Sequence, residues 1–165
     1  MKQLFALILF TSLFTNALAQ AGGEDCATAT VISSIPFVGT GSTSAAVDDY
    51  QETCPDVGNQ GGAKDVVYKY TTGASVEYIT LSLCIAGTNY DSQLYVYEGS
   101  CSSGTSYACQ EDGCQSPAYN NAYNSEIIDL MLQANTDYYI VIDGYSSSQN
   151  GNYRYDFINK TVPET

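Results

Sequence analysis

The chain has 165 residues and a formal net charge of -13, with 18 acidic residues against 5 basic ones and no histidine. This length suits one domain, and the lack of histidine excludes a Ser-His-Asp triad or a histidine-ligated catalytic zinc. Such a negative charge also opposes binding to nucleic acids, because that binding needs clustered lysine and arginine. The composition therefore favours a binding or accessory module over an enzyme.

The N-terminal segment has the three parts of a secretory signal peptide. Lys2 supplies the positive start, residues 4–14 are almost all apolar, and Ala17-Leu18-Ala19 forms a small-x-small cleavage site. The apolar stretch is too short to cross a bilayer as a helix. We therefore expect residues 1–19 to be removed, and the product to be extracellular with no membrane insertion.

Segments with period-two alternation follow one another along the rest of the chain. In order, the expected strands cover residues 28–35, 65–71, 79–83, 93–97, 127–132, 136–143 and 153–157. Residues 136–143 are apolar on both faces, which predicts a central strand. Clusters of Gly, Ser and Asn separate the strands, and no helical period stands out. The sequence thus predicts an all-β fold, an antiparallel β-sandwich or jelly roll of about seven to nine strands.

Six cysteines follow the cleavage site, and an even number in an exported chain predicts disulfides. Cys101 and Cys109 flank a Ser/Gly-rich stretch, which suits a bridged hairpin. We expect Cys26 to join Cys54, which would tie the N-terminal segment to a long loop, and this leaves Cys84 with Cys114. Other pairings stay open, since spacing alone does not fix connectivity. With all six cysteines paired, no thiolate remains for chemistry or metal binding.

Short motifs in consistent order resemble the bacterial pre-peptidase C-terminal domains, in particular the cysteine-containing versions of exported proteins. The motifs that carry the resemblance lie at residues 22–26, 29–32, 48–50, 65–68, 90–97, 108–112, 138–145 and 151–153. The resemblance implies a jelly-roll sandwich over residues 20–159, with a tail or the start of a linker at 160–165. It also implies a non-catalytic module that accompanies a peptidase or another exported protein. Here no catalytic domain precedes the module, which leaves its partner open.

The resemblance also implies a structural calcium ion. In the calcium-binding relatives the acidic ligands come from just before the first strand and from the approach to an Asp-x-x-Tyr strand, which match Glu24, Asp25 and Asp65. Asp48, Asp49 and Glu52, in the loop between them, would complete an oxygen cage of the kind that calcium prefers. The relatives' longer run of Asn and Glu ligands is reduced here to Glu24-Asp25. The alternative is that these carboxylates are solvated surface charges.

A second acidic group and the tyrosines are further candidate binding residues. Asp91, Glu111 and Asp112 are expected near the Cys84–Cys114 bridge, as a metal site or as a polar loop. Tyr95 and Tyr97 share one face of a strand, and an exposed tyrosine face would bind a sugar or a protein surface. Further tyrosines, at positions 119, 123 and 145, lie in or beside loops. The alternative is that tyrosine fills the core, since the chain lacks tryptophan.

The sequence offers little for catalysis. Asp91 and Asp143 are a conceivable pair of carboxylates for glycoside hydrolysis, yet such positions also cap turns, and the short chain leaves little room for a substrate cleft. Our main hypothesis is a secreted, monomeric, non-catalytic module that binds a protein or an extracellular surface. The alternatives are a polysaccharide-binding module that uses exposed tyrosines, and a fragment of a larger exported protein.

Overall fold

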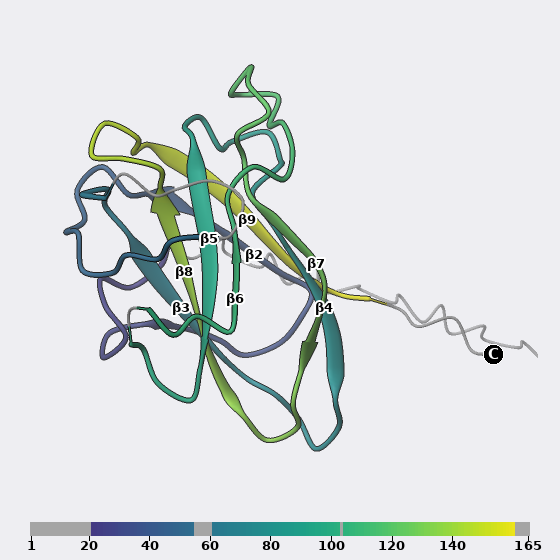
Figure 1. The fold of residues 1–165 in the computed structure, drawn as a ribbon. Helices are drawn as coiled ribbons and strands as arrows, with labels where there is room; N and C mark the ends of the chain where they lie inside the picture. Colours follow the sequence, from purple (N-terminus) through teal and green to yellow (C-terminus); the bar gives the residue numbers. More distant parts are fainter. Residues whose placement is uncertain (1–20, 55–60, 103, 161–165) are drawn as a thin grey trace, which may run out of the picture.

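The protein forms two β-sheets packed face to face (Figure 1). This computed structural model describes residues 21–54, 61–102 and 104–160, so the predicted signal peptide and most of the predicted tail lie outside the described residues. One sheet has the order β1-β3-β8-β5-β6, the other β2-β9-β4-β7. The first sheet contains β1 (Thr30–Ile32), β3 (Val66–Thr71), β5 (Ser92–Glu98), β6 (Ala108–Gln110) and β8 (Asp137–Gly144). The second contains β2 (Phe37–Ser42), β4 (Glu77–Ser82), β7 (Glu126–Leu132) and β9 (Asn152–Asn159).

This architecture confirms the predicted disulfide-stapled β-sandwich. Neighbouring strands pair antiparallel to each other, except that β1 runs parallel to β3. Strand β8 lies in the middle of its sheet, as its two apolar faces predict. Strands β2 and β6 were not expected, since neither has a run of alternating apolar residues long enough to stand out.

The core between the sheets is built largely from tyrosine. In β9, Tyr153, Tyr155 and Phe157 all point inward and are buried, as their alternation predicts. The Tyr153 and Tyr68 hydroxyls lie 3.0 Å apart and share a hydrogen bond, which satisfies both buried polar ends. Tyrosine therefore takes the place of the missing tryptophan and of most phenylalanines.

A second, smaller core covers the outer face of the five-stranded sheet. Here Val67, Tyr95, Tyr97 and Val141 are buried beneath Tyr50 and the cysteines of two disulfides. The expectation that Tyr95 and Tyr97 are exposed is therefore wrong, because both are 0% exposed. The loop that contains residues 47–54 lies over this face. Its buried Glu52 accepts a hydrogen bond from the Tyr97 hydroxyl at 2.8 Å.

The disulfides confirm one predicted pair and correct two. Cys84 joins Cys114, as expected, but Cys26 joins Cys101 and Cys54 joins Cys109. The β5–β6 register explains the correction, because Cys109 lies opposite Tyr95 and not opposite Cys101. Both corrected bridges fasten N-terminal segments across the outer face of the sheet.

The bridges agree with the predicted export, because proteins with three disulfides are typical of oxidising compartments. Within residues 21–54, 61–102 and 104–160, no helix has the length and apolar character needed to cross a membrane. Strand β9 runs the length of the sandwich. It starts where the Asn89 amide donates to the Asn152 carbonyl, and it ends where the Lys160 amide donates to Tyr78.

Candidate functional site

The five carboxylates predicted to bind calcium lie in one region, where the charges of Asp48 and Asp49 act on Asp65. Among the described residues, however, no three of the five have oxygen atoms that all lie within 4.8 Å of one another. Glu24 accepts a hydrogen bond from the Val47 amide, and Asp25 accepts two from Thr28, its amide at 2.8 Å and its hydroxyl at 2.7 Å. The hydrogen bonds from Thr28 lower the pKa of Asp25. Asp25 therefore holds a local turn and Glu24 ties the N-terminal segment to the loop that begins at Val47, while Asp48 and Asp49 are exposed on that loop. Calcium binding by this group remains a prediction.

Asp65 is the buried member of that set. Its Oδ2 accepts hydrogen bonds from the Asp49 and Tyr50 amides at 2.9 and 3.0 Å, which fixes the covering loop. Burial raises its pKa to about 7, and its Oδ1 has no donor among the described residues. Asp143 is also buried, and burial together with the charge of Asp65 raises its pKa well above the usual value. Asp143 accepts a hydrogen bond from Tyr95 at 3.1 Å.

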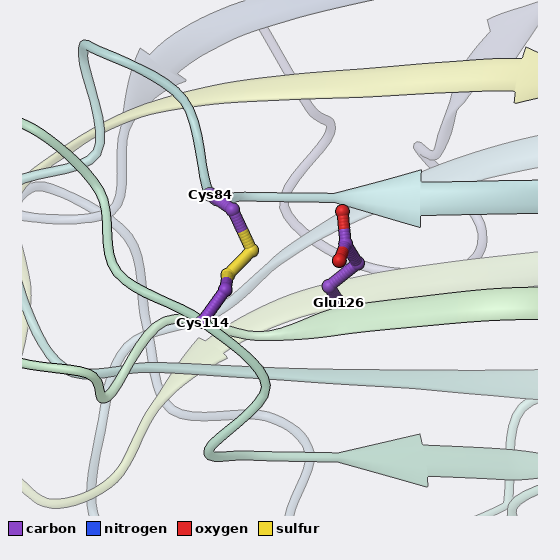
Figure 2. A group of neighbouring side chains, drawn as sticks. All are labelled: Cys84, Cys114 and Glu126. Atoms are coloured by element: carbon purple, nitrogen blue, oxygen red, sulfur yellow. A yellow bond between two sulfur atoms is a disulfide. The ribbon is translucent and has the colours of Figure 1, made fainter.

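Glu126 and the Cys84–Cys114 bridge form a tight group that is not a metal site. Figure 2 shows the carboxylate of Glu126 beside the two sulfurs, with ligand atoms within 4.8 Å of one another. Because the sulfurs are joined in a disulfide, neither is a thiolate that can bind a metal. The bridge is a structural staple between the segment after β4, which contains Cys84, and the β6–β7 loop, which contains Cys114.

A pocket of about 330 Å³ lies at one end of the sandwich, lined by Asp91, Glu111, Asp112, Tyr123 and Tyr145. Asp91 immediately precedes β5, Glu111 and Asp112 follow β6, and Tyr145 follows β8. Strands β8, β5 and β6 are neighbours, and their antiparallel order brings these ends to the same edge of the sheet. Tyr123 comes from the loop before β7 of the other sheet. We call this the acidic pocket.

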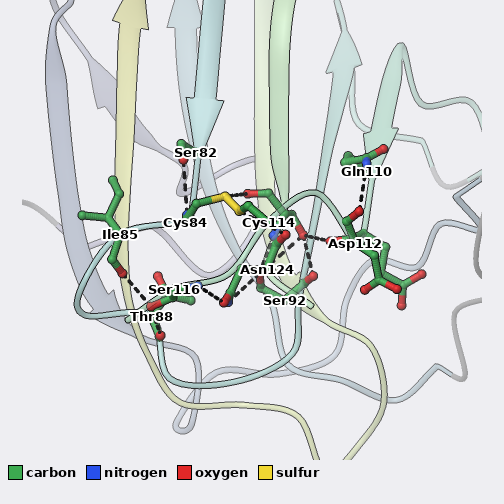
Figure 3. The surroundings of a disulfide bond; sticks show 12 residues. Ser82, Cys84, Ile85, Thr88, Ser92, Gln110, Asp112, Cys114, Ser116 and Asn124 are labelled. Carbon is green, nitrogen blue, oxygen red and sulfur yellow. Dashed lines mark hydrogen bonds between the residues drawn. A yellow bond between two sulfur atoms is a disulfide. The ribbon is translucent and has the colours of Figure 1, made fainter. Parts of the chain in front are cut away.

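The wall of the acidic pocket is held by a buried polar network around the Cys84–Cys114 bridge (Figure 3). The side-chain amide of Asn124 donates to the Tyr90 carbonyl at 2.9 Å, and its backbone carbonyl accepts from Gly113 and Cys114. The Ser125 hydroxyl donates to the Glu111 carbonyl at 2.9 Å. These bonds fix the backbone that carries Glu111 and Asp112 against the start of β5.

The carboxylates of the acidic pocket repel one another, and two of them have a buried oxygen without a donor among the described residues. Glu111 is only 3% exposed, and within the described residues neither its Oε2 nor Oδ1 of Asp91 has a hydrogen-bond partner. Burial and the charges of Asp112 and Asp91 raise the pKa of Glu111 to about 7. Burial and the charge of Asp112 raise the pKa of Asp91 to about 6. The pocket is therefore a site of uncompensated negative charge.

Sequence reasoning found this site only in part. The expected grouping of Asp91, Glu111 and Asp112 near the Cys84–Cys114 bridge is confirmed. Tyr123 and Tyr145 stood among the loop tyrosines, and nothing in their spacing links them to the acidic group. Their place in the pocket follows from the sheet order, which brings the end of β8 beside the start of β5.

Comparison with known proteins gives little. No family model and no curated protein matches the chain. Among solved structures, the chain is similar to a family 35 carbohydrate-binding module from an environmental isolate, with 11% identity and a TM-score of 0.35 over 77% of this chain and 99% of that one. So distant a likeness carries no argument about this chain. The resemblance to pre-peptidase C-terminal domains therefore remains a prediction from the motifs that carry it.

Proposed function

We propose that this protein is a non-catalytic, exported carbohydrate-binding module whose ligand occupies the acidic pocket. The observation that carries the proposal is the combination of two tyrosine rings with three carboxylates around one cavity. The cavity of about 330 Å³ falls within the size range of ligand pockets, about 300–1,000 Å³.

The chemistry of the pocket fits a sugar. Hydroxyl groups of a sugar donate hydrogen bonds, and the buried oxygens of Asp91 and Glu111 are acceptors that find no donor among the described residues. Tyr123 is 46% exposed, so its ring can offer an apolar face to the C–H side of a sugar. The hydrogen bonds of Asn124 already hold the wall of the pocket in place before a ligand binds. The protein therefore loses little conformational entropy on binding.

Binding is favoured over hydrolysis by the direction of the pKa shifts. A glycosidase needs two carboxylates in contrasting environments, one with a raised pKa as the acid and one that stays ionised. In the acidic pocket the pKa values of Asp91, Glu111 and Asp112 are all raised, with burial as the largest cause. This arrangement suits ligand binding and supplies no dedicated nucleophile.

Retention on a panel of insoluble polysaccharides, followed by calorimetry with the matching oligosaccharide, tests the proposal. Tyr123→Ala should weaken binding about tenfold or more, the equivalent of about 1.4 kcal/mol. Tyr78→Ala is the matched control, since Tyr78 is similarly exposed but lies in β4. The proposal fails if no polysaccharide retains the protein, or if both variants bind alike. Release of reducing ends from a retained polysaccharide would show catalysis instead.

A second candidate function, a protein ligand, is favoured by an apolar surface on the four-stranded sheet. The exposed large apolar side chains there are Val38, Tyr78, Ile128, Met131 and Ile158. Tyr78 lies opposite Met131 in the β4–β7 pair. Retention on insoluble fibrous proteins would be lost in Ile128→Asp and kept in Val31→Asp, a control that is equally exposed at 62% but lies in β1. Equal retention of the two variants would rule out this surface.

A further inference from the structure

We propose that the acidic pocket binds a divalent cation of the calcium type, held by Asp91, Glu111 and Asp112. This site is separate from the one predicted at Glu24, Asp25, Asp48, Asp49 and Asp65. It does not depend on sugar binding, although a bound cation would also offer coordination positions to sugar hydroxyls.

The first argument is the burial of Glu111. A carboxylate buried without a donor is costly, and proteins compensate such groups with a proton, a hydrogen bond or a cation. Glu111 lines the pocket, and only 3% of the residue is exposed. Its Oε2 atom has no hydrogen-bond donor among the described residues. Asp91 Oδ1, in the same pocket, has the same deficit. Two such oxygens, on residues that line one cavity, are the expected mark of a cation site.

The second argument is that the protein's own cations are used elsewhere. The described basic side chains are Lys64, which donates to the Ser44 carbonyl, Lys69, paired with Asp137, Arg154, paired with Asp156, and Lys160, paired with Asp129. None of these partners lines the acidic pocket. The charge of its three carboxylates is thus left for an ion from solution to balance.

The donor set selects the type of ion. Carboxylate oxygens suit hard cations, and calcium accepts six to eight oxygens at about 2.3–2.6 Å in irregular geometry, whereas magnesium demands a near-ideal octahedron. The three carboxylates do not all lie within 4.8 Å of one another, since the described residues give only Cys84, Cys114 and Glu126 as such a group. Exposed Asp112 is free to turn toward the ion, while the network around Asn124 fixes Glu111.

Terbium luminescence offers a direct test, because terbium replaces calcium and is excited by nearby tyrosine. The chain has no tryptophan, and Tyr123 and Tyr145 line the pocket. The oxidised protein should give tyrosine-sensitised emission that calcium displaces, and calcium should raise the thermal midpoint relative to chelator. Glu111→Gln should weaken terbium binding about tenfold or more, and Asp112→Asn, on an exposed side chain that cannot upset folding, should weaken it in the same direction.

The matched control is Glu24→Gln, which removes a carboxylate from the N-terminal group and keeps an oxygen for the Val47 amide. It should bind terbium as the unaltered protein does. Absence of emission and of a calcium-dependent shift overturns the proposal, as does binding that survives in Glu111→Gln and Asp112→Asn but is lost in Glu24→Gln. Sugar retention is measured separately with calcium and with chelator. Calcium binding without any sugar retention would refute the proposed function and leave the cation site standing.

Discussion

Acidification from pH 8 to pH 5, in the presence of chelator, should increase the free energy of unfolding of this protein. Asp65 has a pKa of about 7 in the folded state because it is buried, against an ordinary value of 3.8. The folded state therefore binds more protons than the unfolded state, so the stability from this group is complete below about pH 4 and is lost as pH rises through 7. At about 1.4 kcal/mol per pKa unit, the full loss for Asp65 alone, from below pH 4 to above pH 7, is on the order of 4 kcal/mol, and about 2 to 3 kcal/mol of it falls between pH 5 and pH 8.

The other buried carboxylates act in the same direction. The pKa of Asp143 is raised well above its usual value by burial, and the pKa values of Asp91 and Glu111 are raised to about 6 and about 7. Many proteins instead lose stability on acidification, because their carboxylates are ionised and paired in the folded state. In this protein a rise in stability toward pH 5 is the expected trend.

Urea unfolding at a series of pH values measures the slope of the free energy of unfolding against pH. Asp65→Asn should flatten it, since the amide oxygen still accepts from the Asp49 and Tyr50 amides and no longer titrates. Asp137→Asn is the control, because hydrogen bonds from Lys69 and Thr71 lower the pKa of Asp137 and its stability contribution runs the other way. A stability that is constant or that increases toward pH 8 would contradict the burial of Asp65 and Asp143.

Removal of the Cys54–Cys109 bridge should destabilise the protein by about 4 kcal/mol, from the entropy of a loop closed over a separation of 55 residues. The double variant Cys54→Ala/Cys109→Ala releases the loop over the outer face, where Tyr95 and Tyr97 depend on it for burial. Urea unfolding gives the loss of stability, and thiol titration should find no free cysteine.

The variant Cys101→Ala/Cys109→Ala distinguishes the observed connectivity from the pairing expected from sequence. In the structure these residues belong to different bridges, so the variant loses both and leaves Cys26 and Cys54 without their partners. Had Cys101 and Cys109 been joined, only one bridge would be lost and the stability would fall much less. Peptide mapping of the unaltered protein should yield a Cys26–Cys101 peptide, and a Cys101–Cys109 peptide would contradict the structure.

The strands were the most predictable part of the fold because alternation is a local property. Residues 79–83 and 153–157 alternate clearly, and they correspond to β4 and β9. The same alternation misled at Tyr95 and Tyr97. The outer face of β5, which its tyrosines and polar residues made us expect to be exposed, is buried because a loop some 45 residues earlier in the chain covers it. The Tyr97 hydroxyl donates a hydrogen bond to Glu52 of that loop. Which loop covers which face is a long-range fact that period-two spacing does not encode.

The residues of the acidic pocket also differ in how far the sequence predicts their position. The sequence predicts the grouping of the three carboxylates, Asp91, Glu111 and Asp112. The Cys84–Cys114 bridge and the neighbouring strands β5 and β6 hold them together, and this bridge and these strands lie close to one another along the chain. Tyr145 comes 54 positions after Asp91 in the printed sequence, and the two meet through a backbone hydrogen bond of 3.2 Å from the Tyr145 amide to the Asp91 carbonyl. Only the order of the sheet brings them together.

The direction of β9 has a practical consequence for how the module is displayed. This strand of eight residues starts at the end of the sandwich that carries the acidic pocket, and at about 3.4 Å per residue its last residue lies about 24 Å from its first. Figure 1 shows the end of β9 at the right-hand side of the molecule, away from the end where β5 and β9 begin, so a tether fused after Lys160 would start there. Immobilised in that way on a sensor chip or bead, the domain would present its pocket outward, toward the solution.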